Sequence, residues 1–465
     1  MIAKLPTLDT VTTINKDGSR YFLHPADVKG RFTSARRWFA LLLLVVYILL
    51  PWIPINGFPA VFLDVEFRRF HLFGLTFAAQ DLWLAFFVIT GVGFSLFYIT
   101  ALFGRLWCGW ACPYTVFLEH VFRRIERLID GDAVSRRRLD NAPLTFVKIF
   151  KRVLKHSIYL LVSFVIAHIF LAYFVSLSKL WQMMLVAPAE HMLAFSIVLF
   201  ITGALYGSFA WFREQFCIIL CPYGRIQSAL TDDHTTIVGY DTKRGEPRGK
   251  AGTVGAGDCI NCTRCVQVCP TGIDIRNGLQ LECVGCSACI DACDDIMTKL
   301  KRPRGLIRYD SMSGFAGKKT RWIRPRIIVY TILMAIGATV LTFSVLGLKP
   351  FQSGLTRLQG MPYYVSEKSV RNQFQVRLIN KESQIRKFTF TLEGAPPGTT
   401  MNGPSAEFEV GPMTEALNAI MIEIPRAAYK GKQDLRLRIT SQPGNVVVTK
   451  DFEFAGPDPR LLNDK

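Results

Sequence analysis

The chain has 465 residues, of which 50% are hydrophobic and 20% are charged, and its formal net charge is +19. This composition is too apolar for a disordered chain, and the length excludes a single small binding module. The mean hydropathy of +0.26 is concentrated in a few long apolar runs, so we expect a membrane protein. A surplus of Lys and Arg can indicate a nucleic-acid partner, and the position of these residues along the chain decides whether it does.

Five apolar runs are long enough to cross a bilayer, since about 20 helical residues at roughly 1.5 Å rise span about 30 Å of hydrocarbon. These runs cover residues 38–54, 82–103, 157–177, 192–212 and 327–348. The first run follows a polar, basic arm at 1–37, and no small-residue cleavage site follows it. We therefore expect a retained helix rather than a signal peptide.

Lys and Arg residues alternate between the segments that join these runs. They number 7 before the first run, 11 between the second and third, and 18 between the fourth and fifth, against 2 and 1 in the other two loops. The positive-inside rule then places the N-terminus and both cysteine-bearing segments in the cytoplasm and the C-terminal region outside. The 16 basic residues of that region do not alter this orientation, because long domains translocate largely regardless of charge. Topology and anionic lipid therefore explain the basic surplus without nucleic acid.

A short cysteine motif occurs twice in the chain. Cys108 and Cys112 are followed by Pro-Tyr, and the same arrangement returns 109 residues later at Cys217 and Cys221. Two apolar runs precede each motif. The simplest explanation is a duplicated unit that forms a four-helix membrane core over 38–239, with approximate two-fold symmetry and both motifs at the cytoplasmic membrane edge.

Each motif pair is spaced i,i+4, which on a helix presents both thiols on one face. Such a pair can hold a soft ion such as Cu(I) or cycle between dithiol and disulfide, whereas the alternative is inert, buried cysteine. Nearby Arg105 and Arg225 are expected to favour the thiolate form. The candidates for catalytic thiols and copper ligands are Cys108, Cys112, Cys217 and Cys221.

After a Gly-, Lys- and Arg-rich linker at 240–257, the segment 258–300 carries two runs of the form Cys-x-x-Cys-x-x-Cys-x-x-x-Cys. This is the spacing of a bacterial two-cluster ferredoxin, in which three thiolates of one run hold a cubane and the fourth reaches the other cluster. Zinc is the alternative, and disulfides are disfavoured in a cytoplasmic segment. The assignment to two [4Fe–4S] clusters is Cys259, Cys262, Cys265 and Cys293 for the first, and Cys283, Cys286, Cys289 and Cys269 for the second.

A basic connector at 301–326 leads to the fifth span, at 327–348. Beyond it, the segment 349–465 consists of short alternating runs separated by Pro-Gly or Asn-Gly turns, and it contains no cysteine. This pattern predicts an antiparallel β-sandwich. The predicted fold class is therefore a multi-domain membrane protein with an α-helical core of five spans, a cytoplasmic two-cluster ferredoxin-like domain and a C-terminal sandwich.

Several isolated side chains are weaker candidates. Histidines in or near the third and fourth spans could ligate haem or hydrogen-bond a quinone, although packing is their more common role, and methionines near the outer surface could attract copper. These residues are His71, His168 and His191, and Met183, Met184 and Met192. No Gly-rich nucleotide fingerprint stands between a predicted strand and a helix, so we expect no built-in NAD or flavin site.

The ordered combination of these features resembles the CcoG family, also called FixG or RdxA, of accessory proteins for cbb3-type cytochrome c oxidase assembly. The duplicated Cys-x-x-x-Cys-Pro motif is also similar to that of the quinol-oxidising NapH and NosR types, so the immunoglobulin-like C-terminal domain makes the resemblance specific. It implies a multi-pass protein of the bacterial inner membrane that reduces Cu(II) to Cu(I) in the cytoplasm. The duplicated thiols would then handle copper, the eight ferredoxin cysteines would relay electrons, and the partners would be copper carriers and oxidase assembly factors.

Three functions are consistent with this sequence. The first is a membrane cupric reductase that uses the duplicated thiols. The second is a quinol- or flavodoxin-linked electron-transfer subunit, in which His168 or the groove between helices handles quinone and the thiols are structural. The third is a non-enzymatic assembly scaffold whose outer sandwich recruits partners. The electron donor, the cluster potentials and the oligomeric state, for which a homodimer is one option, are left open.

Overall fold

The computed structural model describes Thr13 and residues 21–66, 68–78, 81–382, 384–404 and 407–462. The chain forms two compact units. The first comprises Met1–Ile53, Val61–Asp64 and Trp83–Leu341, and the second comprises Pro54–Ala60, Val65–Leu82 and Thr342–Lys465. Each unit is described separately below.

Five helices in the described part of the chain are long and apolar enough to cross a membrane, which confirms the five predicted spans. They are α1 (Arg31–Leu49), α2 (Leu82–Phe103), α7 (Phe146–Leu171), α9 (Met192–Gly207) and α15 (Pro325–Leu346). The 3-10 turn η3 (Pro188–His191) and the π-helical turn η4 (Ser208–Phe212) extend α9 at its two ends, so this span covers Pro188–Phe212.

The helix ends differ from the ends of the apolar runs. Helix α1 begins at Arg31 rather than at residue 38, because a polar, basic turn continues the helix beyond its apolar part, and it ends before Pro51. Helix α7 begins at Phe146 rather than at residue 157, where the Thr145 hydroxyl accepts a hydrogen bond from the Lys148 backbone N–H at 3.3 Å. Hydropathy marks the length that hydrocarbon covers, whereas capping side chains mark where a helix begins.

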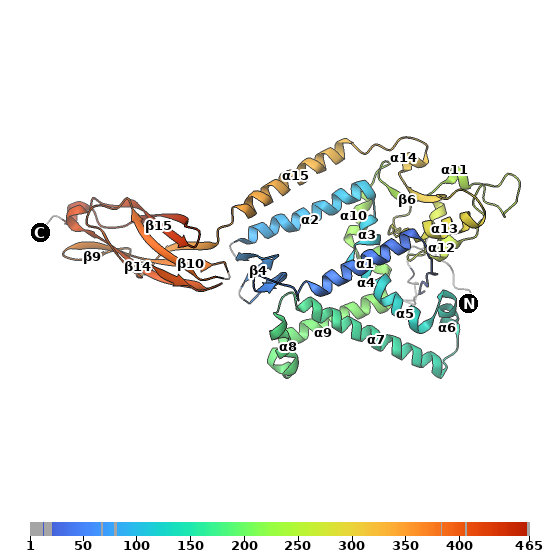
Figure 1. The fold of residues 1–465 in the computed structure, drawn as a ribbon, viewed down its shortest axis with the longest axis horizontal. Helices are drawn as coiled ribbons and strands as arrows, with labels where there is room; N and C mark the ends of the chain where they lie inside the picture. The colour runs from blue at the N-terminus through green and yellow to red at the C-terminus, as the bar shows by residue number, and fades with distance from the viewer. Residues whose placement is uncertain are drawn as a thin grey trace. The chain divides into compact units, whose positions relative to one another are not determined.

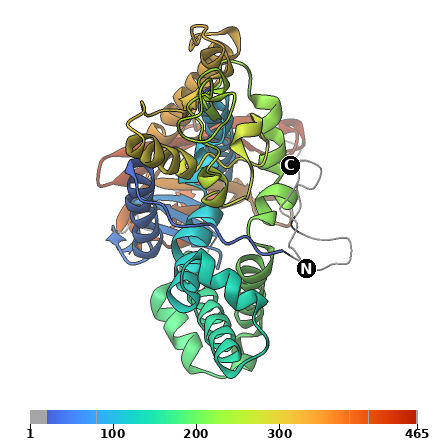
Figure 2. The same ribbon diagram turned by 90° about the vertical axis from the view of Figure 1, so that its right-hand side faces the viewer.

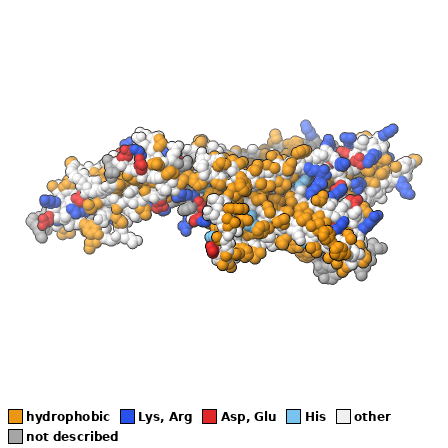
Figure 3. Space-filling model, turned by 60° about the horizontal axis from the view of Figure 1, so that its bottom comes forward, with side chains coloured by type: hydrophobic (Ala, Val, Ile, Leu, Met, Phe, Trp, Pro, Cys, Tyr) orange, Lys and Arg blue, Asp and Glu red, His pale blue; other side chains and the backbone are white. Residues whose placement is uncertain are grey.

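The helices of the first unit present a broad apolar surface. Figure 3 shows hydrophobic side chains gathered in a band, with Lys and Arg side chains beside it. On α1, Trp38 and Leu42 are exposed, and on α7 Leu161 is exposed as well. Because soluble monomers rarely expose contiguous apolar patches beyond a few hundred Å², this band indicates a surface that faces lipid.

Helices α1, α2, α7 and α9 of the first unit lie beside one another, and the short cysteine-bearing helices gather at one end of them (Figures 1 and 2). Helix α7 packs along α9, whereas α1 contacts α3, η2 and α13. The connecting elements are β3 (Val61–Asp64), α3 (Leu106–Trp110), α4 (Pro113–Phe117), η2 (Leu118–Phe122), α5 (Arg123–Asp130), α6 (Ala133–Asn141), α8 (Leu177–Leu185), η5 (Phe216–Leu220) and α10 (Pro222–Leu230).

The ferredoxin segment includes parts of the chain on both sides of its cysteines. Strand β6 (Ile237–Tyr240) pairs antiparallel with β7 (Ile307–Asp310), and both contribute to a core around Ile290 and Leu306. The sequence predicts a linker at 240–257 and a connector at 301–326. It does not predict the pairing of β6 with β7, because two four-residue strands so far apart in the chain leave no local pattern. The remaining elements are α11 (Thr242–Gly245), α12 (Arg264–Gln267), η6 (Ile275–Asn277), α13 (Ala288–Lys299) and α14 (Met312–Phe315).

The second unit contains the antiparallel β-sandwich predicted for the C-terminal region. One sheet has the order β12-β14-β10-β8, with β9 paired to β10, and the other has the order β13-β11-β15-β16. Phe374, Phe388, Ile422 and Leu437 are among the side chains of the core. The elements are β8 (Phe351–Arg357), β9 (Tyr364–Val365), β10 (Ser369–Asn380), β11 (Arg386–Glu393), β12 (Thr400–Asn402), β13 (Phe408–Val410), β14 (Glu415–Pro425), η7 (Arg426–Ala428), β15 (Gln433–Gln442), β16 (Val446–Phe454) and η8 (Pro459–Leu462).

Most of the loop between α1 and α2 belongs to the second unit. In it, β1 (Pro54–Ile55) pairs with β2 (Phe58–Pro59), and β4 (Arg69–Leu72) pairs with β5 (Leu75–Ala78). Arg69 donates a hydrogen bond to the Met413 carbonyl, and Lys381 forms an ion pair with Asp81. These contacts join the loop to the sandwich within the second unit.

Truncation of Ile422 to alanine should destabilise the sandwich by about 2–5 kcal/mol, because this fully buried side chain of β14 leaves a cavity. The matched control is Leu417→Ala on the same strand, where the side chain is 57% exposed and a change within about 0.5 kcal/mol is expected. Limited proteolysis of the C-terminal region during chemical unfolding of the full-length protein measures both. Equal effects of the two substitutions would contradict the packing described here.

Candidate redox site

The first group of thiols gathers around α12 and α13. Cys265 lies in α12 and Cys293 in α13. Burial, together with the neighbouring thiols of Cys265, Cys259 and Cys262, raises the pKa of Cys293 to about 12. The structure therefore brings together the four cysteines that the spacing assigns to the first cluster. Cys262 is exposed at the surface, whereas Cys259 and Cys265 are buried.

The second group contains Cys269, Cys283, Cys286 and Cys289. Burial is the main reason that the pKa of Cys283 rises to about 12, and the thiols of Cys269 and Cys286 add to the shift. The pKa of Cys289 is raised by burial, by the other three thiols of its own group, and also by Cys265 of the first group. The two groups are therefore close neighbours, as a two-cluster electron relay requires.

The two cysteine runs share the same backbone turn. Asn261 and Thr263 have φ values of 54°, in the left-handed region, and Gly285 and Ser287 at the equivalent positions of the second run have φ values of 66° and 63°. Left-handed conformations are uncommon outside glycine, so their repetition at matching positions is a specific local feature. It curls each run so that its first three thiols converge.

The donor set fits iron–sulfur clusters better than zinc. Among the described residues, no three His, Cys, Asp or Glu side chains lie close enough to hold a single metal ion. A tetrahedral zinc ion needs four thiolates at about 2.3 Å, whereas a cubane is wider and keeps its thiolates farther apart. Ligand binding requires thiolates, so cluster binding would displace the protons that burial otherwise retains.

A third group of thiols forms from the duplicated motifs. We call Cys108, Cys112, Cys217 and Cys221 the membrane-edge thiol group. Burial, with contributions from the thiols of Cys112 and Cys221, raises the pKa of Cys108 to about 11. Burial and the other three thiols of this group also raise the pKa of Cys217. Two segments that are separated in the sequence by a pair of helices thus place four thiols close together.

The helical arrangement expected for these thiol pairs is wrong. Cys108 lies in α3, but Cys112 is the extended N-cap of α4, so the pair does not lie on one continuous helix face. Cys221 is likewise the extended N-cap of α10, because a proline at the first helical position disfavours helical geometry in the residue before it. Arg105 lowers the pKa of Cys108 as expected, but burial has the larger effect and raises the pKa overall, and a corresponding effect of Arg225 stays a prediction.

The tyrosines of the two motifs exchange contacts between the halves of the membrane core. The Tyr114 hydroxyl donates to the Ser208 carbonyl at 3.2 Å and to the Arg213 carbonyl at 2.6 Å. The Tyr223 hydroxyl hydrogen-bonds with the Thr100 hydroxyl at 2.5 Å. Each tyrosine therefore binds the end of the helix pair in the other half. Such paired contacts are expected when two copies of a duplicated unit are related by two-fold symmetry.

The ligand loop of the second group lies directly on the first motif. A Cβ atom added to Gly109 would come within 2.7 Å of the Val284 carbonyl oxygen and 2.8 Å of Gly285 backbone atoms. Cys108 packs against a cluster of buried side chains that includes Val284 and Cys286. The three groups therefore follow one another in space, from the first ferredoxin group through the second to the membrane-edge thiols.

Hydrogen bonds hold this junction in place. The Trp110 indole N–H donates to the Tyr309 hydroxyl at 3.3 Å, and that hydroxyl donates to the Gly285 carbonyl at 3.1 Å. The buried Gln227 amide donates to the Cys108 sulfur at 3.4 Å. Sequence reasoning missed Gln227, because nothing in the local pattern of α10 marks it as a neighbour of the first motif.

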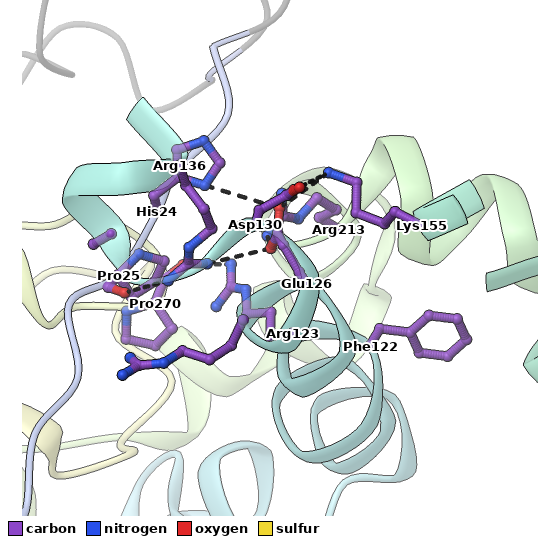
Figure 4. A network of polar contacts seen from close by, with 12 residues as sticks. His24, Pro25, Phe122, Arg123, Glu126, Asp130, Arg136, Lys155, Arg213 and Pro270 are labelled. Atoms are coloured by element: carbon purple, nitrogen blue, oxygen red, sulfur yellow. Dashed lines mark hydrogen bonds and ion pairs between the residues drawn. The ribbon is translucent and has the colours of Figure 1, made fainter. Parts of the chain in front are cut away.

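A buried ion network supports the other side of the second group. Arg123 of α5 pairs with Glu214 at 2.9 Å and donates to the Pro270 carbonyl at 3.2 Å, next to Cys269. Figure 4 shows this network, in which further charged side chains from separate segments converge on Glu126. The distances to Glu126 are 3.0 Å from Arg213, 3.3 Å from Arg136 and 3.8 Å from Lys155, and Lys155 lies 2.6 Å from Asp130.

Four of the six histidine and methionine candidates lie together, and the other two lie apart from them. His168, His191, Met183 and Met184 line one apolar cavity of about 270 Å³ between α7 and α9. His168 Nδ1 lies 2.9 Å from the Phe164 carbonyl oxygen, within hydrogen-bonding distance. The other two are elsewhere, with Met192 exposed and His71 stacked on Phe58 in the second unit. A role for these residues in binding haem, quinone or copper stays a prediction.

Comparison with known proteins gives three family matches. The model of a 4Fe-4S dicluster domain matches residues 212–312, that of a 4Fe-4S binding domain matches 83–132, and that of the IG-like fold at the C-terminus of FixG matches 341–457. Protein RdxA of Cereibacter sphaeroides is 36% identical over 389 residues, covering 80% of this chain and 82% of its own.

Two further relatives are similar over most of their length. Nitrogen fixation protein FixG of Rhizobium meliloti is 34% identical over 421 residues, covering 81% of this chain and 80% of its own. Protein RdxB of Cereibacter sphaeroides is 34% identical over 463 residues, covering 93% of this chain and 95% of its own.

The fold and the ferredoxin thiol groups together define a membrane-bound iron–sulfur electron-transfer protein. Each of the three relatives matches 80% or more of this chain. The chain belongs to the FixG/RdxA family.

Replacement of Gly109 by alanine should displace the loop that carries Cys283 and Cys286, because the added methyl meets backbone atoms that cannot rotate away. We expect electron transfer from the second cluster to slow by roughly tenfold or more while the iron content is kept. The matched control is Gly93→Ala, where an added Cβ meets nothing within 4 Å. Stopped-flow reoxidation of the reduced protein measures the rate. An unchanged rate in the Gly109 variant would contradict this contact.

The Glu126 carboxylate should make stability depend on pH. Burial alone would raise its pKa from 4.5, but Arg213, Lys155 and Arg136 outweigh burial and hold the pKa at about 2. A carboxyl whose pKa falls on folding stabilises the protein above pH 4.5, and this contribution of about 3 kcal/mol is lost as the pH falls toward 2. Thermal unfolding of the detergent-solubilised protein between pH 5 and pH 2.5 should show the loss.

The Glu126→Gln variant tests the origin of that pH dependence. It should be less stable than the wild type at pH 7, since buried arginines lose their partner, and it should show a smaller further decline below pH 4.5. Glu409→Gln, in which an exposed carboxylate is removed from the sandwich, should keep the wild-type profile. A Glu126 variant with the full wild-type decline would show that other carboxyl groups cause it.

Proposed function

We propose that this protein passes single electrons through its two ferredoxin groups to Cu(II) at the membrane-edge thiol group, and supplies Cu(I) for the assembly of a cbb3-type cytochrome c oxidase. The contact between Gly109 and the loop Val284–Gly285 carries this proposal, because it sets the ligand loop of the second cluster against Cys108. Electrons would then pass from the ferredoxin groups to a soft-metal site on the adjoining surface, in that direction only.

The chemistry needs one electron for each ion, since Cu(II) gains one electron to become Cu(I). When bound, [4Fe–4S] clusters supply one-electron transfer. Cys262 is exposed, so the first group offers the surface at which a soluble one-electron donor protein would dock. Cys286 is buried, so the second group is shielded from such donors and can deliver the electron inward.

The membrane-edge thiols suit copper as a substrate. Soft sulfur ligands favour Cu(I) over Cu(II), so they assist the reduction. Burial keeps Cys108 protonated at neutral pH, and an incoming ion would displace the proton. Within the described residues these thiols do not form a closed site for a single ion.

The proposed location is the bacterial inner membrane, with the N-terminus and the ferredoxin groups in the cytoplasm and the sandwich in the periplasm. The alternation of Lys and Arg between the loops supports this orientation. The proposed partners are cytoplasmic copper carriers and assembly factors of the oxidase. A homodimer is one proposed oligomeric state.

A second candidate places a third iron–sulfur cluster at the same four thiols. The 4Fe-4S binding domain match at residues 83–132 covers just two cysteines, Cys108 and Cys112, and the dicluster match at 212–312 includes Cys217 and Cys221. Four thiols are the number that a [4Fe–4S] cluster needs. In this version the third cluster would be the last relay before an acceptor.

Anaerobic reduction followed by addition of Cu(II) distinguishes these functions. The test compares the wild type with a variant in which Cys108, Cys112, Cys217 and Cys221 are all serine, and a Cu(I)-specific chelator follows the product. We expect the wild type to reduce Cu(II) and to contain about eight iron atoms per chain. The variant should keep that iron and lose Cu(II) reduction by roughly tenfold or more.

Iron content separates the alternatives. About twelve iron atoms in the wild type and about eight in the serine variant would establish the third cluster in place of the thiol–copper site. If neither protein reduces Cu(II) while the clusters of both reduce and reoxidise normally, copper is the wrong acceptor and a quinone analogue is the next acceptor to try.

A further inference from the structure

A cavity of about 90 Å³ beside the second thiol group is lined mainly by arginines. We call it the arginine pocket, and its cationic residues are Arg36, Arg37, Arg123, Arg124, Arg127 and Arg136. The carboxylates among its lining residues are Asp27 and Glu119, and each is already paired, with Arg127 and Arg123 respectively. Glu214 and Glu126, which lie outside the lining, also pair with Arg123 and Arg136, so among the described residues the positive excess of the pocket comes from Arg36, Arg37 and Arg124.

Several donors of this pocket lack acceptors. In the part of the chain that the structure describes, the Nε atoms of Arg37, Arg123 and Arg136 are buried and have no hydrogen-bond partner. Over the same described residues, Arg124 forms no ion pair. A buried donor without a partner costs about 1–3 kcal/mol, and more if it is charged, so the arrangement favours an occupant that accepts hydrogen bonds.

The electrostatics of the lining also favour an anion. His120 lines the pocket next to these arginines. Burial is the largest cause that lowers the pKa of His120 to about 4; the charge of Arg36 also lowers it, Glu119 opposes the shift, and Arg124 and Arg37 contribute less. The imidazole is therefore neutral at physiological pH and does not itself add positive charge to the pocket, while the charges of Arg36, Arg124 and Arg37 act on it in the direction expected beside a cationic cluster.

Size restricts the occupant to a small group. Pockets for drug-sized ligands and cofactors usually measure about 300–1,000 Å³, so 90 Å³ does not hold a flavin or a nicotinamide nucleotide. A phosphate group fits this size, offers several acceptor oxygens and forms paired hydrogen bonds with guanidinium groups. The chemistry of the lining thus selects a phosphate group.

The position of the pocket relates it to lipid and to the redox groups. Arg36 and Arg37 lie in the polar first turns of α1, directly before the exposed Trp38 on the apolar surface. Pro270 and Ala288 also line the pocket, and they adjoin Cys269 and Cys289 of the second thiol group. A phosphate bound here would touch both the polar edge of the apolar band and the loops that hold the second cluster.

We propose that the arginine pocket binds a phosphate group next to the second thiol group. The headgroup of an anionic membrane lipid and free phosphate share this chemistry. The inference does not depend on copper, because it concerns a pocket whose residues belong to neither the membrane-edge thiols nor the ferredoxin ligands.

The test measures binding by the full-length protein with its clusters in place. Calorimetry with inorganic phosphate in a neutral, lipid-free detergent reports a soluble anion site, and native mass spectrometry compares retention of phosphatidylglycerol with that of phosphatidylcholine. Arg124→Gln and Arg37→Gln should each weaken binding by roughly tenfold, since each removes a charge-assisted donor. Arg124 is exposed, so its variant is expected to fold normally, which iron content and thermal unfolding verify.

The matched control is Arg138→Gln, which removes the same charge from an exposed position of α6 outside the pocket and should leave binding within about twofold of the wild type. Phosphate binding in detergent would support the proposal with a soluble ligand, and selective retention of phosphatidylglycerol without phosphate binding would support it with a lipid headgroup. Absence of binding with both probes would overturn it, because the arginines would then only offset cluster charge. An equal loss in the Arg138 variant would also overturn it, since binding would then follow overall charge.

Discussion

The close backbone contact at Gly109 is the constraint on which the redox arrangement depends. Atoms of Val284 and Gly285 occupy the space that any side chain at position 109 would need. A similar contact exists in the second motif, where a Cβ atom on Gly224 would come within 2.8 Å of the Cys217 carbonyl oxygen. The missing side chain at Gly109 therefore lets the ferredoxin segment approach a membrane motif closely, whereas the missing side chain at Gly224 lets the second motif fold closely on itself.

Buried charge complements this packing. Isolated burial of Glu126, Arg213 or Lys155 would be strongly unfavourable, and for Glu126 the charges of its partners outweigh the cost of burial. Such networks seldom add much net stability, but they restrict the ways in which segments can meet. Here Arg123 joins the network to the Pro270 carbonyl, so α5 and the segment after α9 fix where the Cys269 loop lies.

Local sequence patterns correctly predict the features that interactions between residues close in the sequence determine. Hydropathy identified the five spans, cysteine spacing selected the two ferredoxin sets that the structure brings together, and alternation identified the sandwich. The same patterns did not give the helix break before Cys112, although Pro113 follows it and could have indicated that break. Recognition of the proline effect would have corrected the helical-face assumption.

The features that the sequence did not predict depend on contacts between residues far apart in the chain. Gln227 beside Cys108, Glu214 beside Arg123, and the pairing of β6 with β7 each join segments that are distant in the sequence. No local pattern encodes such partners, because a polar residue on a helix looks the same whether it faces water or a buried charge. The arginine pocket is another example, since it combines α1, α5 and the loops of the ferredoxin segment.

The unequal exposure of the ferredoxin cysteines has a consequence for oxidative damage. Cys262 reaches the surface, while Cys286 is buried behind α13 and the membrane motif. Oxidation of cysteine follows its accessibility as well as its thiolate character. Oxidants should therefore attack the outer cluster first and spare the inner one. The protein would then lose its outer cluster while the inner cluster and its loop are still intact.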